Sequence, residues 1–222
     1  MGDQVIPLRG VRGMIAVNMR RSLDEAAQLT HHASCDVTNL LQYKESLGQK
    51  GFKVSVEDLF CKCLVDVLKD YPFMNGHIEG NNIYVSESIH LSIAIALEDN
   101  LLVAPTIFEA QNLSLIEVNQ SRKELVKRAK QGKLSIAEMT KGTFTISNLG
   151  LSRVEHFTPI INIPQIAILG IGQTVKRPIV NSDGDIEIRS VVGLSLTFDH
   201  RAVDGGPAAA FLSSLCERIE QV

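Results

Sequence analysis

The sequence lacks the features that would place this protein in a membrane or on nucleic acid. Its 222 residues contain no Trp, and its apolar runs are shorter than the ~20 residues that a membrane-spanning helix needs. The formal net charge is −3, so we expect no broad nucleic-acid-binding surface. No basic segment followed by an apolar run opens the chain, which argues against a secretory signal. We therefore expect neither a membrane nor a nucleic acid as partner.

Cysteine is scarce, and its spacing matches neither a zinc site nor a disulfide framework. The four cysteines are Cys35, Cys61, Cys63 and Cys216. Cys61 and Cys63 stand two residues apart in a helical pattern, where their side chains would point in different directions. We expect free, buried thiols in a reducing compartment and no bound metal.

Segments with helix and strand periodicity alternate along the chain, which is 45% hydrophobic and can fill a core. The helical spacing of apolar residues predicts helices over 10–28, 55–70, 114–132 and from Pro207 onward. Alternating or continuous apolar residues predict strands over 91–97, 143–147, 164–175 and 191–198, with hairpins turning at 80–82 and 183–184. No linker divides the chain. We expect one domain over residues 1–222 with an α/β fold, a two-layer sandwich of a mixed β-sheet with helices on one face.

The strand within "GTFTISNLG" is predicted to have two chemically different faces. Phe144 and Ile146 share one face, whereas Thr143, Thr145 and Ser147 share the other, because successive side chains in a strand point to opposite sides. Taken alone, Ser147 is best explained as a strand-end hydroxyl that bonds to the backbone.

The stretch "TFDHRAVDGGPAAAFL", residues 197–212, places a histidine between two carboxylates where a buried strand ends. A neutral imidazole at a rigid strand end is suited to act as a general base near neutral pH. Asp204 could fix the turn that presents His200. Gly205 and Gly206 are predicted to allow a tight backbone path, with Pro207 at the first helical position.

A purely structural interpretation of this stretch is also open, in which both aspartates cap the turn and Arg201 pairs locally. The chain has no Gly-x-Ser-x-Gly motif and no cysteine in evidently electropositive surroundings, so it offers no obvious covalent nucleophile. If His200 is a general base and the chain has no nucleophile for it to activate, the substrate is expected to supply the nucleophile. A thiol, with a pKa near ~8.5, needs only modest help from an imidazole.

Together with other motifs, this stretch resembles the catalytic domain of the dihydrolipoyl acyltransferases, the core component of the 2-oxo acid dehydrogenase complexes. It resembles chloramphenicol acetyltransferase more distantly, through the His-x-x-x-Asp-Gly signature. The matching segments occur in the family's order and span nearly the whole chain: "PLRGVRGMIAVNM", "CDVTNLL", "GTFTISNLG", "FTPIINIPQIAILGIG" and "LSLTFDHRAVDGGPAAAFL".

The resemblance implies a catalytic role for His200, Ser147 and Asp204. His200 would deprotonate the thiol of coenzyme A or of a dihydrolipoyl group, and Ser147 would donate to the oxyanion. Asp204 would form an ion pair with an arginine, for which Arg12 is the first candidate beside the competing Arg9, Arg20 and Arg21. Arg201 and Gly205 would support the turn.

The resemblance also implies a homotrimer with active sites between subunits, where His200 faces Ser147 of the neighbour. Trimers would assemble into a 24-mer or a 60-mer. The expected partners are a lipoyl domain and the dehydrogenase and dihydrolipoamide dehydrogenase components. Coenzyme A would be a substrate, and the lipoyl group would reside on a domain absent from this chain. The expected location is a bacterial cytoplasm or a mitochondrial matrix.

The acyl group is less defined by the sequence than the reaction is. The small residues of "DGGPAAAFL" favour acetyl transfer, as in complexes that act on pyruvate or acetoin. Succinyl or branched-chain acyl transfer is also open, because such acyl groups differ by few pocket contacts. Two further functions compete with dihydrolipoyl acyl transfer: an O-acetyltransferase that acts on a small alcohol, and a core subunit that only scaffolds a complex.

Overall fold

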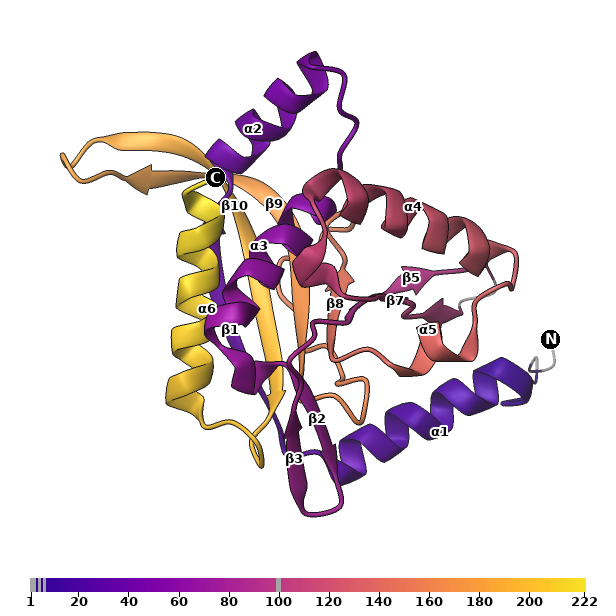
Figure 1. Cartoon of the computed structure of the whole chain (residues 1–222). Helices are drawn as coiled ribbons and strands as arrows, with labels where there is room; N and C mark the ends of the chain where they lie inside the picture. The colour runs from indigo at the N-terminus through magenta and orange to yellow at the C-terminus, as the bar shows by residue number, and fades with distance from the viewer. Residues whose placement is uncertain (1–2, 4, 6, 99–100) are drawn as a thin grey trace.

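The structure is a computed structural model, and it describes residues 3, 5, 7–98 and 101–222. Within these residues, six strands form one mixed sheet in the order β1-β10-β9-β8-β4-β7 (Figure 1). β9, β8 and β4 run parallel to one another, whereas β1, β10 and β7 pair antiparallel with their neighbours. The predicted mixed sheet is confirmed.

The strands of this sheet are short in the middle of the chain and long near its end: β1 (Gln28–Asp36), β4 (Leu91–Ile93), β7 (Thr106–Ile107), β8 (Phe144–Asn148), β9 (Ala167–Val180) and β10 (Ile186–Asp199). Two small hairpins stand apart from it: β2 (Gly76–Glu79) with β3 (Asn82–Val85), and β5 (Ile95–Ala96) with β6 (Leu102–Val103). The helices are α1 (Gly10–Glu25), α2 (Thr38–Gln49), α3 (Val56–Asp70), α4 (Leu115–Lys130), α5 (Ile136–Thr140) and α6 (Gly205–Glu220). Short 3₁₀ turns lie at Pro72–Met74 and Ala110–Asn112.

One face of the sheet, here called the apolar face, packs against α3 and α6. Its alternate side chains on β8 and β10, Phe144, Ile146, Leu194, Leu196 and Phe198, are completely buried. Fully burying such a side chain contributes about 1.5–3 kcal/mol, so this face supplies much of the hydrophobic core. The alternation in the sequence predicted this face correctly.

The opposite face, here called the polar face, carries hydroxyl side chains that are also buried. Thr145, Ser195 and Thr197 are at most 2% exposed. Residues 149–166, here called the covering segment, lie over this face and bond to it; Thr145 Oγ1 donates to Gln165 Oε1 at 2.5 Å. Buried hydroxyls need such partners, because an unpaired one costs about 1–3 kcal/mol.

Most helices begin where the sequence predicts. Capping boxes form at Ser55 with Asp58, Ser114 with Glu117 and Ser135 with Glu138, each satisfying otherwise unpaired backbone amides. The last helix begins at Gly205 rather than at Pro207. Proline fits within its first turn because an amide there would have no intrahelical acceptor.

The strand predicted over 91–97 is divided. β4 ends at Ile93 and pairs with β7 and β8, whereas β5 begins at Ile95 and pairs with β6 outside the main sheet. Alternation alone does not show which neighbour a strand pairs with, so the sequence could not locate this break. Within the part of the chain that the structure describes, no helix is long and apolar enough to span a bilayer.

Candidate active site

His200 lies directly after β10, in a turn that is tied to the chain before β1. Its backbone N–H donates to the carbonyl oxygen of Ala27 at 2.8 Å. The imidazole is 43% exposed, and its ring centroid lies 5.9 Å from that of the buried Phe198. The side chain is therefore held by the sheet while remaining open to a substrate.

The ion pair that fixes this turn joins Arg201 to Asp199. Arg201 Nη2 donates to Asp199 Oδ2 at 2.6 Å, and the Arg201 backbone N–H donates to Asp199 Oδ1 at 3.0 Å. Asp199 is 2% exposed, and its hydrogen bonds to Arg201 raise the pKa of that guanidinium. The structure thus brings Arg201 to the turn, which agrees both with a supporting role and with a local ion pair. The structural interpretation, in which the aspartates cap the turn and Arg201 pairs locally, predicted this role of Asp199.

Asp204 stands at the N-cap of α6 without a side-chain capping bond. Its side chain is 85% exposed, and Oδ1 lies 3.7 Å from His200 Nδ1. A carboxylate on the Nδ1 side favours the tautomer that carries its proton on Nδ1 and leaves Nε2 as the proton acceptor.

Arg12 is not at the histidine turn of its own protomer. The first residues of α1 line a groove beside β6 and α5, whereas the turn after β10 lies on the other side of the molecule (Figure 1). The ion pair of Asp204 that the described residues provide is with His200, not with an arginine. The inferred Asp204–Arg12 pair therefore does not form within one protomer.

The glycines after Asp204 were predicted to allow a tight backbone path, and the protomer does not use that freedom. Neither Gly205 nor Gly206 has a positive φ angle. A Cβ on Gly205 would lie 3.8 Å from the ring of His31, an ordinary contact, and one on Gly206 would have no neighbour within 4 Å. Within the protomer, the backbone at these two positions therefore does not depend on glycine.

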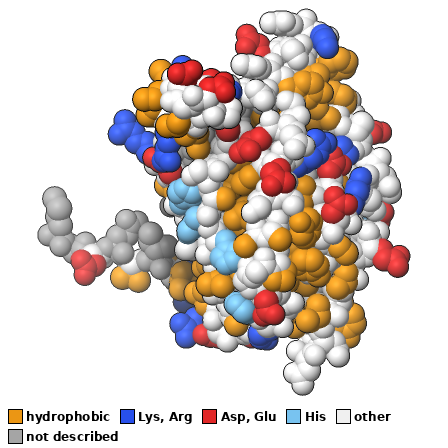
Figure 2. Space-filling model, turned by 90° about the vertical axis from the view of Figure 1, so that its left-hand side faces the viewer, with side chains coloured by type: hydrophobic (Ala, Val, Ile, Leu, Met, Phe, Trp, Pro, Cys, Tyr) orange, Lys and Arg blue, Asp and Glu red, His pale blue; other side chains and the backbone are white. Residues whose placement is uncertain are grey.

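Gly205 instead adjoins a second imidazole, that of His31 on β1. The His31 ring packs edge-on against Phe198, with centroids 5.0 Å apart, so Phe198 contacts both His31 and His200. In the sequence, the adjacent His31-His32 pair was the only indication of a second imidazole near His200. Figure 2 shows histidine side chains in a strip on this side of the molecule.

Ser147 lies on the polar face at the end of β8 and is half-buried. Through the strand register it is level with Gly170 of β9 and Ser195 of β10. His200 follows Ser195 by five residues, or about 16 Å along the strand, and β10 lies two strands away from β8, about 10 Å. One protomer therefore does not bring His200 and Ser147 together.

Cys61 and Cys63 do not provide a nucleophile at this turn. Burial raises the pKa of Cys61 well above its ordinary value and that of Cys63 to about 11, so both remain protonated thiols. Among the residues that the structure describes, no group of three or more His, Cys, Asp or Glu side chains could hold a metal ion.

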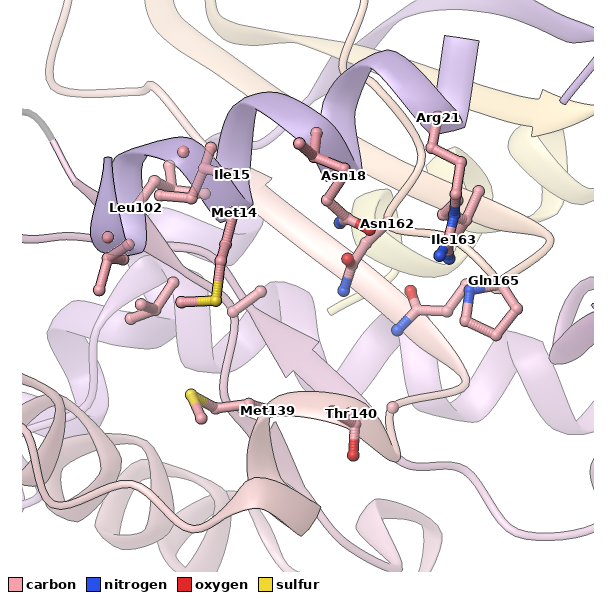
Figure 3. A pocket seen from close by; sticks show the side chains of 18 of the residues that line it. Met14, Ile15, Asn18, Arg21, Leu102, Met139, Thr140, Asn162, Ile163 and Gln165 are labelled. Carbon is pink, nitrogen blue, oxygen red and sulfur yellow. The ribbon is translucent and has the colours of Figure 1, made fainter. Parts of the chain in front are cut away.

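A groove of about 880 Å³ runs between α1 and the body of the protein (Figure 3). Met14, Leu102 and Met139 line one end, and Asn162 and Gln165 lie toward the other. Neither His200 nor Ser147 lines this groove. It is thus separate from the histidine turn of the same protomer.

Comparisons with known proteins agree with the fold and the motifs. The chain shares its fold with chloramphenicol acetyltransferase at a TM-score of 0.58 and 14% identity, over 98% of each chain. This likeness places it in the α/β fold class of that enzyme. The family model for the 2-oxoacid dehydrogenases acyltransferase catalytic domain matches residues 1–222. The chain belongs to this acyltransferase family.

Individual relatives are named for different acyl groups. The acetyltransferase component of the acetoin cleaving system of Bacillus subtilis is 40% identical over 98% of this chain and 56% of the relative. A mitochondrial succinyltransferase component of the 2-oxoglutarate dehydrogenase complex, from Schizosaccharomyces pombe, is 37% identical over 97% of this chain and 49% of its own. The chain therefore spans about half the length of these relatives.

Solved structures resemble the protomer closely. The probable dihydrolipoamide acetyltransferase of Listeria monocytogenes 4b F2365 matches with a TM-score of 0.93 and 35% identity, over 99% of this chain and 95% of that one. The cubic core of a pyruvate dehydrogenase multienzyme complex matches with a TM-score of 0.91 and 28% identity, over 99% and 92%. Relatives of this fold thus form cores of multienzyme complexes.

Proposed function

We propose that the protein transfers an acyl group directly between coenzyme A and a dihydrolipoyl thiol, with His200 as the general base. The observation that carries this proposal is the half-exposed imidazole of His200, held at a strand end with the Asp204 carboxylate 3.7 Å from Nδ1. This arrangement leaves Nε2 able to take a proton from a thiol, a contribution typically worth about 10²–10⁴ in rate.

The transfer needs no covalent enzyme intermediate. His200 Nε2 takes the proton of the acceptor thiol, and the resulting thiolate attacks the carbonyl carbon of the donor thioester. The tetrahedral oxyanion accepts a hydrogen bond from the Ser147 hydroxyl, typically worth about 10²–10³ in rate. Collapse breaks the original carbon–sulfur bond, and the departing thiolate takes the proton back from the imidazolium.

The reaction requires a second copy of the chain, because His200 and Ser147 lie far apart in one protomer. We propose a homotrimer with active sites between subunits, assembled further into a 24-mer or a 60-mer. The likeness to a cubic core supports this, as do apolar side chains that one protomer leaves uncovered. Met14 and Val17 on α1 are 66% and 68% exposed, and Ile186 and Ile188 on the β9–β10 hairpin are 75% and 73% exposed.

The favoured acyl group is acetyl, and the partners are a lipoyl domain and the two dehydrogenase components of a pyruvate or acetoin complex. The acetoin relative at 40% identity supports acetyl over succinyl, whose relative is 37% identical. The small difference leaves succinyl and branched-chain acyl groups as outcomes of the test. The proposed location is a bacterial cytoplasm or a mitochondrial matrix, as for complexes of this kind.

The decisive experiment is acyl transfer from acetyl-CoA to free dihydrolipoamide, beside succinyl-CoA, isobutyryl-CoA and an alcohol acceptor. We expect fast transfer of acetyl to the dithiol and none to the alcohol. His200→Ala should abolish transfer while leaving the assembly intact. Turnover close to wild type in that variant would remove His200 as the base.

Ser147→Ala distinguishes oxyanion donation by Ser147 from a role in substrate binding. Because the hydroxyl acts on the transition state, kcat should fall by about 10²–10³ with little change in KM. An effect confined to KM would assign Ser147 to substrate binding instead.

A further inference from the structure

Four residues on neighbouring strands form a row across the polar face of the sheet. His32 on β1 is paired with Ser195 on β10, Ser195 with Gly170 on β9, and Gly170 with Ser147 on β8. Residues paired in register point to the same side of a sheet. The row therefore leads from an imidazole at the sheet edge to the proposed oxyanion donor, with no side chain at Gly170.

The covering segment fills the gap that Gly170 leaves. A Cβ on Gly170 would lie 2.7 Å from the ring of Phe157, so this ring rests directly on the strand between Ser195 and Ser147. Two further glycines allow the same close approach. A Cβ on Gly172 would lie 1.9 Å from the carbonyl oxygen of Glu155, and one on Gly193 would lie 2.0 Å from it. Residues 155–157 thus lie against Gly170, Gly172 and Gly193, here called the glycine path.

Ser195 joins this segment to the edge strand. Its Oγ accepts the backbone N–H of Phe157 at 3.4 Å and lies 2.9 Å from His32 Nδ1. In the neutral tautomer of His32 that carries its proton on Nε2, the hydroxyl donates to Nδ1 while accepting from Phe157. The His32 ring also packs edge-on against the ring of His156, with centroids 5.2 Å apart. Ser195 and His32 therefore hold residues 156 and 157 by two separate contacts.

The covering segment begins at the end of β8, two residues after the proposed oxyanion donor. Leu149, two residues beyond Ser147, donates its N–H to the Ile171 carbonyl at 2.9 Å, and Gln173 donates its N–H to the Val154 carbonyl at 2.7 Å. A shift of residues 155–157 would move the ring that rests on Gly170, the residue paired with Ser147. Displacements of about 1 Å at a reacting centre can cost on the order of 10²-fold in rate.

We propose that His32 and Ser195 are positioning residues for acyl transfer, which hold residues 155–157 on the glycine path and so fix the surroundings of the Ser147 hydroxyl. This inference rests on the proposed function. The pKa of His32 is lowered by partial burial and by the neighbouring imidazoles of His156 and His31, which keeps the ring neutral near pH 7 and able to accept a hydrogen bond from the Ser195 hydroxyl.

The test compares four variants of the assembled protein in the acetyl-CoA and dihydrolipoamide assay. Ser195→Ala and His32→Ala should each lower kcat by about 10- to 100-fold with KM almost unchanged. His32→Asn should restore kcat to near the wild-type value, because its amide occupies the place of Nδ1. Exchange of the Phe157 amide hydrogen should be faster in Ser195→Ala and His32→Ala than in wild type.

Thr30→Val is the matched control. Thr30 Oγ1 and Thr197 Oγ1 form a hydrogen bond of 2.8 Å between the same two strands on the same face, but the bond does not involve the covering segment. Thr30→Val should keep wild-type kcat and Phe157 exchange. The proposal is overturned if Ser195→Ala and His32→Ala behave as Thr30→Val does, or if His32→Asn is as impaired as His32→Ala. An inactive wild type would instead overturn the proposed function, and this inference with it.

Discussion

The two faces of the six-stranded sheet are built from the same strands but are stabilised differently. On the apolar face, Phe144 and Ile146 pack without directional bonds against helices. On the polar face, Thr145 and Ser195 are equally buried, yet each contacts a particular partner in hydrogen-bonding geometry. Hydrophobic burial is roughly proportional to area, whereas a hydrogen bond depends on distance and angle. The polar face is therefore the one that can hold a reacting group in place.

This difference explains why the candidate site lies where it does. His200 follows β10 and Ser147 belongs to β8, and the apolar side chains of both strands are anchored in the core. The groups around them, Asp199, Ser195 and the covering segment, belong to the polar face. Packing in the core keeps the strands rigid, and hydrogen bonds on the polar face fix the positions of the groups around the site.

The largest expected effect concerns the apolar face. Phe144→Ala should lower the free energy of unfolding by about 3–5 kcal/mol, because it opens a cavity in a fully buried site. Urea denaturation measures this. A loss below about 1 kcal/mol would mean that the neighbouring helices close the cavity, and that this face is less tightly packed than the structure indicates.

The neighbouring residue tests the polar face. Thr145→Val keeps the shape but leaves Gln165 Oε1 without the donor that it has at 2.5 Å. We expect a loss of about 1–3 kcal/mol in the free energy of unfolding, smaller than for Phe144→Ala. Denaturation of both variants under one condition compares the faces directly. Equal losses would show that the Thr145 hydroxyl on the polar face contributes as much to stability as the Phe144 ring on the apolar face.

A smaller effect of opposite sign is expected at the start of α6. Gly206→Ala should raise the free energy of unfolding by about 0.4–1 kcal/mol, because the φ angle is ordinary and a Cβ would meet nothing within 4 Å. Thermal denaturation together with the transfer assay measures it. A protein that is more stable but less active would indicate that a substrate or a neighbouring subunit occupies the space beside Gly206.

The smallest effect is a pH dependence that arises from the polar face. The pKa of His32 is lowered in the folded protein from the ordinary value of 6.5, so on acidification the unfolded chain binds this proton first. The free energy of unfolding should therefore fall as the pH drops through 6.5 toward the lower pKa of His32. Urea midpoints at about pH 7.5 and about pH 5.5 should differ less for His32→Asn than for wild type. An identical difference would remove His32 as the source.

Local patterns were enough to predict much of the fold. The alternation in "GTFTISNLG" assigned Phe144 and Thr145 to opposite faces, and the apolar spacing over 114–132 predicted α4, because strand alternation and helical periodicity act over two to four residues. Where the strand over 91–97 breaks depended on which strands it meets, which residue spacing does not encode.

The sequence by itself determined the chemical groups of the candidate site: a histidine at a strand end, flanking carboxylates and a strand-end serine. The tertiary structure decided how they are used. It paired Arg201 with Asp199, left Asp204 facing His200, and placed Ser147 too far away for one protomer to complete the site. It also aligned His32 and Ser195 with Ser147. The contact between His32 and Ser195 joins residues 163 positions apart, and it follows from strand order and register rather than from local spacing.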